Sequence, residues 1–265
     1  MGLPHMTRPQ ITVTIIALNE QAKIGDAISS VSWADEVVVV DSGSTDQTRE
    51  IATRLGAKVL FHAWEGYGQQ KNFAQDQASH DWVLNIDADE VVSTELKQEI
   101  FAFFEQCPTD SGQVGGFEMP RKTFYLGRWI RHGGWYPNYL VRLANRQKAR
   151  WSEPNVHEEL RVRGRVERLK SPLLHDPFNS ISDQILTNLS FSRLGSLDLK
   201  SKGQKPSLIR LVLKPIGKFL ETYFLKRGFL DGLPGFIISV NAAHSIFLKY
   251  AYLMETELRT ERSHC

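Results

Sequence analysis

The sequence has few cysteines and no long apolar run. Its 265 residues include two cysteines, Cys107 and Cys265, which are too few for a disulfide framework and favour a reducing compartment. No stretch reaches the roughly 18 uninterrupted apolar residues that a membrane-spanning helix needs. Residues 1–10 lack the apolar centre of a secretion signal, and we interpret them as a tail that is disordered or derived from cloning. We therefore expect a cytoplasmic protein without a spanning helix.

The chain also has little net charge, but its charges are unevenly placed. The formal net charge is +2, from 32 Lys/Arg and 30 Asp/Glu. Residues 1–120 carry 7 basic and 18 acidic side chains, residues 121–170 carry 13 and 4, and residues 200–228 carry 8 and 1. The basic rear half predicts an anionic partner, either a nucleic acid, a membrane surface or a phosphorylated substrate.

Apolar, β-branched runs alternate with helical patterns in the first 90 residues. The runs predict buried strands over 11–18, 36–41, 57–62 and 81–90, with polar helices between them. This alternation is typical of a parallel sheet that is covered by helices on both faces. Hydrophobic residues make up 42% of the chain and charged residues 23%, as in a globular protein.

Polar sequences follow three of these strands, namely ALNE at 17–20, DSGSTD at 41–46 and DADE at 87–90. Ligands bind beyond the carboxyl ends of the strands in sheets of this kind, so we expect the three sequences to meet at one crevice. Asp87 and Asp89 can share a divalent cation, and their oxygen ligands suit Mg²⁺ or Mn²⁺ bridged to a phosphate. The alternative is a helix N-terminus that carries acids to suit its dipole.

These motifs together resemble glycosyltransferase family 2. The segment TIIALNE … VVVVDSGSTDQT … KNFA … LNIDADE, within residues 11–110, matches the motifs of that family in order. The continuation GGWYPNYLVRL … VHEEL, within residues 133–160, is similar to a narrower branch, the lipopolysaccharide-core β-glucosyltransferase-like proteins. The resemblance implies an inverting enzyme with an α/β, GT-A nucleotide-binding fold. In that fold a mostly parallel central sheet is flanked by helices, and here C-terminal amphipathic helices follow it.

The resemblance also predicts how the chain is organised. Residues 11–110 form the nucleotide-sugar-binding half of the domain. Residues 111–178, rich in Gly, Arg and aromatics, form the acceptor-binding and catalytic-base half of the same domain. Residues 179–265 are helical and amphipathic, and we expect them to associate with a membrane or with another subunit.

The resemblance implies that residues at the strand ends bind the donor. Ala17 and Glu20 lie against the nucleobase and ribose, and Asn19 shapes the turn. Asp41 contacts the base, and the alternative for Ser42 to Asp46 is a purely structural Asx turn and helix cap. The full nucleotide-sugar-binding set implied by the resemblance is Ala17, Asn19, Glu20, Asp41, Lys71, Asp87 and Arg142.

Two members of this set are cations with a competing interpretation. Lys71 precedes Asn72 and is implied to lie near uracil or the diphosphate, whereas on its own it is typical of a solvated helix lysine. Arg142 and Arg131 are candidate partners of the diphosphate or of an anionic acceptor.

A metal site at DADE is a further implication of the resemblance. Asp89 binds Mg²⁺ or Mn²⁺ directly, and Asp87 faces the ribose or a metal-bound water. His157 completes the metal shell or steadies the diphosphate, although a lone histidine is as often structural. We interpret Glu90 as an acid at the start of a helix and not as a ligand.

Inversion in one step needs a general base that takes the proton of the acceptor hydroxyl. In an extended PNVHEEL segment Glu158 and Glu159 point to opposite faces, so only one of them can face the crevice. The resemblance to a VHE pattern favours Glu158 as the base, with Glu159 as the fallback. Trp135 and Tyr136 are predicted to stack on the acceptor sugar, and the alternative for such a pair is core packing.

Residues 205–228 predict a basic amphipathic helix. Arg210, Lys214 and Lys218 recur at four-residue intervals beside an apolar stripe, as in helices that lie on an anionic membrane surface. The alternative is packing against the catalytic domain or against a second copy, which would make a homo-oligomer. Pro215 is expected to kink this helix or split it in two.

The sequence therefore predicts a metal-dependent inverting glycosyltransferase at the inner face of the cell membrane. Its donor is a nucleoside-diphosphate sugar, with UDP favoured by the habit of the family, and its acceptor is lipid-linked or of the lipopolysaccharide type. One alternative is a sugar nucleotidyltransferase, but its first loop would be glycine-rich where this chain has ALNE. Another is a non-catalytic sugar-nucleotide-binding scaffold at the membrane. We expect no nucleic-acid partner, since no recognition motif accompanies the basic residues.

Overall fold

The computed structural model describes residues 8–106, 113–152 and 158–262, which form two compact units. The first unit comprises the described residues up to Lys122 together with Asn138–His175. The second comprises Thr123–Pro137 together with the described residues from Asp176 onward. The segment 123–137, which connects two strands of the first unit in sequence, thus groups with the C-terminal helices.

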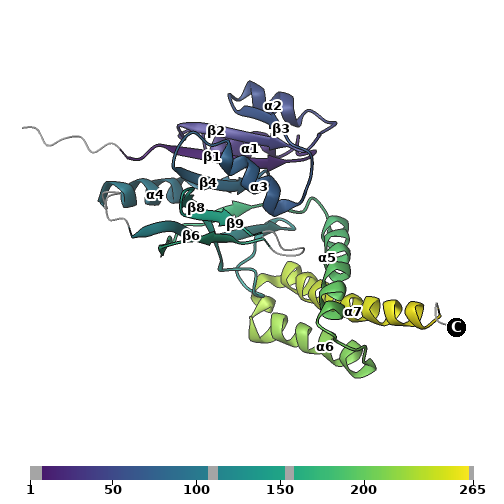
Figure 1. Cartoon of the computed structure of the whole chain (residues 1–265). Helices are drawn as coiled ribbons and strands as arrows, with labels where there is room; N and C mark the ends of the chain where they lie inside the picture. The colour runs from purple at the N-terminus through teal and green to yellow at the C-terminus, as the bar shows by residue number, and fades with distance from the viewer. Residues whose placement is uncertain (1–7, 107–112, 153–157, 263–265) are drawn as a thin grey trace, which may run out of the picture. The chain divides into compact units, whose positions relative to one another are not determined.

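The first half of the sheet in the first unit is parallel (Figure 1). Strands β3, β2, β1 and β4 lie side by side in this order, and each neighbouring pair is parallel. These strands and the helices between and after them are β1 Ile11–Ala17, α1 Ile24–Ser30, β2 Glu36–Asp41, α2 Thr48–Arg54, β3 Lys58–Phe61, α3 Tyr67–Asp76, β4 Trp82–Asp87, β5 Glu90–Val92 and α4 Thr94–Gln106. The predicted α/β alternation is confirmed.

The second half of the sheet is largely antiparallel. β8 pairs antiparallel with β4, β6 pairs antiparallel with β8, and β12 pairs antiparallel with β5. The described residues between β6 and β12 contain no helix, so they provide no helical crossover of the kind that joins parallel neighbours. The strands of this half are β6 Val114–Tyr125, β7 Arg128–Trp129, β8 Asn138–Asn145, β9 Ala149–Trp151, β10 Leu160–Val162, β11 Arg165–Arg168 and β12 Leu173–His175.

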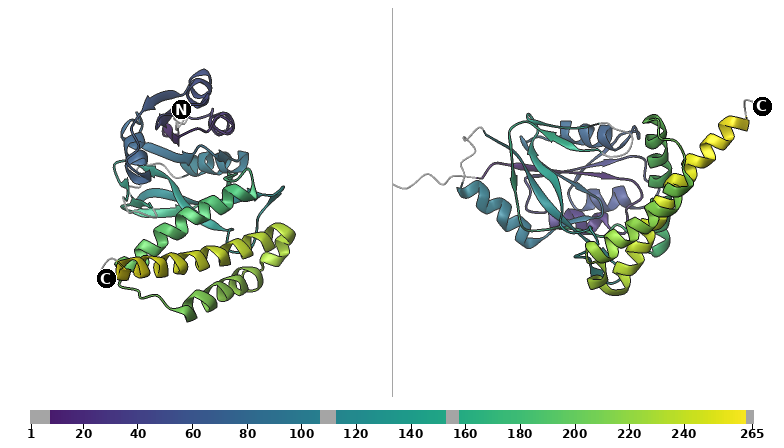
Figure 2. Two further views of the ribbon diagram at one scale, coloured as in Figure 1. Left: turned by 90° about the vertical axis from the view of Figure 1, so that its right-hand side faces the viewer. Right: turned by 90° about the horizontal axis from the view of Figure 1, so that it is seen from below.

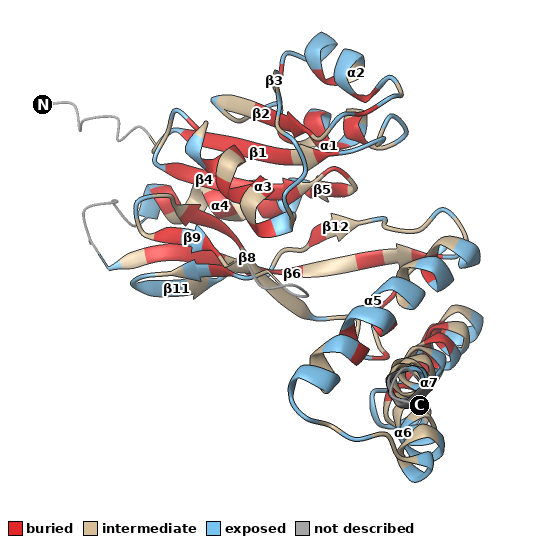
Figure 3. Ribbon diagram, turned by 45° about the vertical axis from the view of Figure 1, so that its right-hand side comes forward, coloured by how far each residue is buried: buried red, intermediate tan, exposed pale blue. Residues whose placement is uncertain are grey.

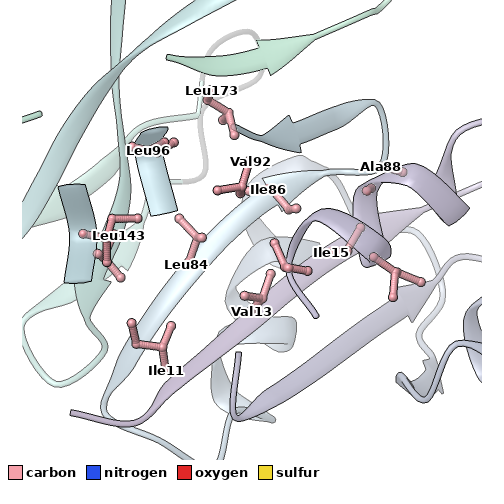
Figure 4. Packing of buried hydrophobic residues seen from close by; sticks show 14 of the residues in the cluster. Ile11, Val13, Ile15, Leu84, Ile86, Ala88, Val92, Leu96, Leu143 and Leu173 are labelled. Carbon is pink, nitrogen blue, oxygen red and sulfur yellow. The ribbon is translucent and has the colours of Figure 1, made fainter. Parts of the chain in front are cut away.

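Alternating side chains place an apolar core on each face of the parallel strands. Val39 of β2 joins the larger core, where side chains of α1 and α4 also lie, while Val38 and Val40 pack against Ala74 of α3 on the other face. The larger core includes Val13 and the other labelled residues of Figure 4, and it is the main buried region of this unit (Figure 3). Burial on both faces explains why these strands are continuous apolar runs in the sequence.

The second unit is helical, and its long helix α7 lies between α5 and α6 (Figure 2). Its elements are α5 Ile181–Ser201, α6 Leu208–Leu220, the π-helical turn η2 Glu221–Leu225, the 3-10 turn η3 Gly228–Asp231 and α7 Gly232–Arg262. α6 runs through Pro215, so the helix is not split in two there, and the alternative expectation of a kink stays a prediction. Among the described helices, none is long and apolar enough to cross a membrane.

Candidate active site

The carboxyl end of β4 carries the acids of the DADE sequence. Asp87 is the last residue of β4, and Asp89 lies in the turn before β5. Glu90 begins β5 and is fully buried, so its interpretation as a helix-start acid is wrong. Its Oε2 accepts a hydrogen bond of 2.9 Å from the backbone N–H of Asp87, which ties the turn together.

Arg142 of β8 neutralises two of these acids from within the sheet. Its Nη2 donates to Asp87 Oδ2 at 2.7 Å and to Glu90 Oε1 at 2.6 Å, and the residue is 3% exposed. Arg121 of β6 adds a bond of 3.4 Å from its Nη1 to Glu90 Oε1. Burial opposes ionisation, but the charges of Asp87 and Glu90 outweigh it and raise the pKa of Arg142. The guanidinium is thus engaged by carboxylates, and its predicted contact with a diphosphate stays a prediction.

Lys71 of α3 supplies the second cation of the site. Its Nζ lies 3.1 Å from Asp87 Oδ1, 3.0 Å from Glu158 Oε1 and 4.6 Å from the ring centroid of Trp151. The residue is 5% exposed, so it is not the solvated helix lysine of the alternative interpretation. Burial would raise the pKa of Asp87, but the charges of Arg142 and Lys71 hold that pKa well below its usual range.

Asp89 has a different neighbour, His175 at the end of β12. His175 Nε2 lies 3.4 Å from Asp89 Oδ2, and the side chain of Asp89 is 21% exposed. The pairing of β12 with β5 places His175 opposite Glu90, next to the acidic turn. Sequence reasoning missed this histidine, because nothing local in LLHDP distinguishes it and only the strand pairing brings it to the site.

The loop after β1 brings a further acid toward DADE. Ala17 ends β1, and Asn19 adopts a left-handed φ of 56°, with its Oδ1 accepting from the backbone N–H of Thr45 at 2.9 Å. Burial, and next the charge of Asp89, raise the pKa of Glu20. Glu20 therefore faces the same acidic edge as Asp89, whereas the contacts of Ala17, Asn19 and Glu20 with a nucleotide stay predictions.

Asp41 at the end of β2 is fully buried in its own turn. Its Oδ1 accepts hydrogen bonds from the backbone N–H groups of Gly43 at 3.0 Å and Ser44 at 2.9 Å, and its Oδ2 accepts from the Ser44 hydroxyl. These bonds match the structural-turn alternative for DSGSTD, and the predicted contact of Asp41 with the base stays a prediction.

Two adjacent glutamates were the candidates for the base, and they differ in their surroundings. Glu158 is 23% exposed at its side chain and is paired with Lys71 at the site, whereas Glu159 is exposed. His157 lies outside the described residues. Burial, and next the charge of Glu158, raise the pKa of Tyr67, so this tyrosine at the start of α3 also faces the site, although it remains 56% exposed.

The described residues do not form a complete metal cage. No group of three or more His, Cys, Asp or Glu side chains among them is arranged to hold a metal ion. Both carboxylate oxygens of Asp87 already face cations, while Asp89 is partly exposed beside His175 and raises the pKa of Glu20. This donor set fits a hard cation that takes its remaining ligands from phosphate and water, with Asp89 as the protein carboxylate.

Trp135 and Tyr136 belong to the second unit. Trp135 packs with Tyr125 and Phe178 in an apolar cluster, as in the core-packing alternative. The segment that carries them is anchored by buried Asp231, whose Oδ2 accepts from the backbone N–H groups of Arg131 at 3.1 Å and His132 at 2.7 Å. Stacking of Trp135 and Tyr136 on an acceptor stays a prediction.

A parallel α/β sheet with polar loops beyond its strand ends defines the class of nucleotide-binding folds. Within that class the chain belongs to glycosyltransferase family 2, whose family model, Glycosyl transferase family 2, matches residues 12–163. The chain is thus a glycosyltransferase with the predicted GT-A fold.

Proteins that are similar to this chain are also named glycosyltransferases. It is 36% identical over 261 residues to an uncharacterized glycosyltransferase of Rickettsia felis, covering 95% of this chain and 92% of that protein. It is 30% identical over 252 residues to the lipopolysaccharide core biosynthesis glycosyltransferase LpsC of Rhizobium meliloti, covering 92% of each. A solved structure of glucosyl-3-phosphoglycerate synthase from Mycobacterium tuberculosis, in complex with Mn²⁺, UDP and glucosyl-3-phosphoglycerate, is 29% identical over 45% of each chain, with a TM-score of 0.35.

Proposed function

We propose that the protein is a metal-dependent inverting glycosyltransferase that uses a UDP-sugar and a lipid-linked or lipopolysaccharide-type acceptor. The observation that carries the proposal is the network at the end of β4, where Lys71 and Arg142 hold Asp87 while Asp89 stays partly open. The acceptor class is supported by the similarity to LpsC, and UDP by the habit of the family.

Asp89 and His175 would hold the divalent cation, together with oxygens of the donor. When bound, the cation stabilises the negative charge that develops on the leaving diphosphate. Lys71 is placed to contribute positive charge to the same phosphates, because its Nζ lies at this edge between Asp87 and Glu158. Arg142 keeps Asp87 ionised and fixes its orientation from the buried side.

Glu158 accepts the proton of the acceptor hydroxyl in this proposal. It is the glutamate of the pair that lies beside Lys71, whereas Glu159 is exposed. The hydroxyl oxygen forms the new bond to the anomeric carbon as the bond to the diphosphate breaks, and the proton passes to the Glu158 carboxylate. Transfer should therefore stop in Glu158→Gln while UDP binding persists.

We propose further that the enzyme works at the cytoplasmic, anionic face of a membrane, where such an acceptor is found. The motivation is the basic helix α6, on which Arg210, Lys214 and Lys218 accompany exposed apolar residues. Binding of the nucleotide donor and binding to the membrane can be measured separately, so the two parts of the proposal have separate tests.

The test is calorimetric titration of UDP, GDP and CMP into the full chain, with and without Mn²⁺. We expect Mn²⁺-dependent binding of UDP that is lost in Asp89→Ala. The matched control is Asp81→Ala, because Asp81 is a 64% exposed carboxylate just before β4, at the opposite end of that strand from Asp87. The absence of nucleotide binding under every condition would refute the proposed donor site, and with it the sugar-nucleotide-binding scaffold, and equal loss of binding in both variants would refute the role of Asp89.

A further inference from the structure

Buried polar side chains lie between helices of the second unit, in addition to the apolar cluster around Ile238. Where α5 meets α7, the hydroxyl of Ser192 donates to the backbone carbonyl of Ser245 at 3.0 Å, and the amide of Asn241 donates to Gln184 Oε1 at 2.5 Å. Ser192 and Gln184 are each 2% exposed, and Asn241 is 9% exposed. Polar side chains are thus part of the contact between α5 and α7, where large apolar residues are more usual in soluble bundles.

Glycines allow the same close approach. Gly195 of α5 faces Lys249 of α7, where an added Cβ would lie 3.2 Å from Lys249 Cδ. An added Cβ on Gly235 of α7 would lie 2.0 Å from the carbonyl oxygen of Gly228, so this glycine allows the neighbouring turn η3, and not α5, to approach α7 closely. Small residues and short hydrogen bonds between helices are the means by which helices associate in lipid, where burial of leucine gives no advantage.

Many other large apolar residues of this unit are exposed, above all on α6. On α6 the exposed fractions are 69% for Leu208, 70% for Ile209, 56% for Val212, 59% for Leu213, 52% for Ile216 and 48% for Leu220, and no residue of the helix is buried. Figure 3 shows the exposed and intermediate colours along α6. At 100° per residue these six apolar residues fall within one arc of about 140° around the helix axis, so they form one face of α6.

The outward face continues onto α7. Leu233, Phe236, Val240 and Phe247 follow one another at spacings of three, four and seven, and are 69%, 43%, 42% and 42% exposed. The ring of Phe236 lies 6.0 Å, centroid to centroid, from that of Phe219 on α6. The two helices therefore share one apolar face, which we call the α6–α7 face and define by Leu208, Ile209, Val212, Leu213, Ile216, Leu220, Leu233, Phe236, Val240 and Phe247.

The charge around this face selects among its possible occupants. Residues 200–228 carry eight Lys/Arg and one acid, Glu221, which is already paired with Lys218 and Lys226. A two-fold contact between copies would set this basic surface against itself. An anionic leaflet would neutralise it while its acyl chains cover the apolar face.

We propose that the α6–α7 face inserts into the acyl region of an anionic lipid leaflet, so that lipid, and not a second protein copy, covers it. This inference rests on the membrane location in the proposed function. It assigns the membrane contact to the apolar residues of two helices instead of to the basic residues of α6 alone. The polar interface of α5 with α7 is then the interior of the embedded unit, and the exposed leucines and phenylalanines are its lipid contacts.

The experiment is co-sedimentation of the full chain with vesicles of phosphatidylcholine alone or mixed with phosphatidylglycerol. The double variant Leu213→Glu/Leu233→Glu should bind the anionic vesicles at least tenfold more weakly than the parent chain. The matched control is Phe61→Glu, since Phe61 is a 65% exposed apolar residue of the first unit and should leave vesicle binding unchanged. Helical content by circular dichroism checks that the double variant is folded.

Equal vesicle binding by the parent and both variants would overturn the proposal. So would a parent chain that ignores vesicles and forms a dimer which the double variant converts to a monomer, because a second copy would then cover the face. UDP titration of the same samples separates the outcomes. Intact UDP binding with no vesicle binding overturns the membrane contact alone, and vesicle binding without UDP binding overturns the catalytic proposal alone.

Discussion

Replacing Glu158 by Gln should tighten donor binding at the same time as it stops transfer. Lys71 Nζ lies 3.0 Å from Glu158 Oε1 and 3.1 Å from Asp87 Oδ1, so one ammonium group is shared between two carboxylates. In the proposed mechanism the donor diphosphate is a further anion that competes for this ammonium. Removing the charge of Glu158 leaves Lys71 more available to the donor.

The size of the gain follows from the geometry of the pair. The Lys71 side chain is 6% exposed and that of Glu158 is 23% exposed, so solvent screens one partner in part. Such a pair falls between an exposed ion pair, worth about 0–1 kcal/mol, and a buried charged hydrogen bond, worth about 1.5–3 kcal/mol. Taking about 1 kcal/mol, we expect the Kd for UDP in Mn²⁺ to fall about fivefold in Glu158→Gln.

Calorimetric titration of UDP measures this change directly. Glu159→Gln is the matched control, because it removes the same charge from an exposed neighbour, and its Kd should stay within error of the parent. Lys71→Met should weaken UDP binding, and in the double variant the gain from Glu158→Gln should vanish, since the shared ammonium is gone. Unchanged or weaker UDP binding in a folded Glu158→Gln protein would refute the competition.

Three further changes test other parts of the structure. Glu90→Gln should lower the free energy of unfolding by about 1.5–3 kcal/mol in urea titrations, because it weakens one charged hydrogen bond of buried Arg142 while Asp87 still pairs with that guanidinium; a loss below about 1 kcal/mol would contradict the network. Burial, and next Asp89, raise the pKa of Glu20, so the stability from this carboxyl is present below about pH 4 and is lost as the pH rises through its folded-state pKa. In Glu20→Gln the free energy of unfolding, measured in urea, should therefore decline less between pH 4 and pH 7 than in the parent chain. An identical pH profile for the two proteins would count against a raised pKa of Glu20. Asp231→Asn should lower the melting temperature, because the backbone N–H groups of Arg131 and His132 then donate to a neutral amide instead of a charged carboxylate. An unchanged melting temperature would show that these hydrogen bonds contribute little to stability.

The parallel half of the fold was predictable because its signals are local. The strand EVVVVD at 36–41 is buried on both faces, so its apolar character survives in any short window of sequence. The antiparallel half lacks such signals. β8 is only partly buried over its first residues, and the pairing that places Arg142 beside Asp87 joins positions 55 residues apart.

The same distinction separates the predicted site residues from those that were missed. Asp87 and Asp89 are marked by their place after an apolar run. Arg121 and His175 carry no such mark, because β6 and β12 bring them to the acids through strand pairing across the chain. Trp135 and Asp41 show a second limit of sequence-based prediction. Trp135 packs in an apolar cluster and Asp41 accepts hydrogen bonds within its own turn, although both side chains are of types that also bind ligands.

The crowding of acids after β4 has two causes that the sequence alone could not separate. Glu90 and Asp87 are matched by Arg142, Arg121 and Lys71, so much of the negative charge holds the sheet together at this edge. Asp89 lies outside these pairs, and the basic group beside it among the described residues is the imidazole of His175, at 3.4 Å. The metal ion of the proposed function therefore accounts for one carboxylate and not three. For this reason Asp89→Ala should affect Mn²⁺-dependent binding far more than stability, whereas Glu90→Gln should do the reverse.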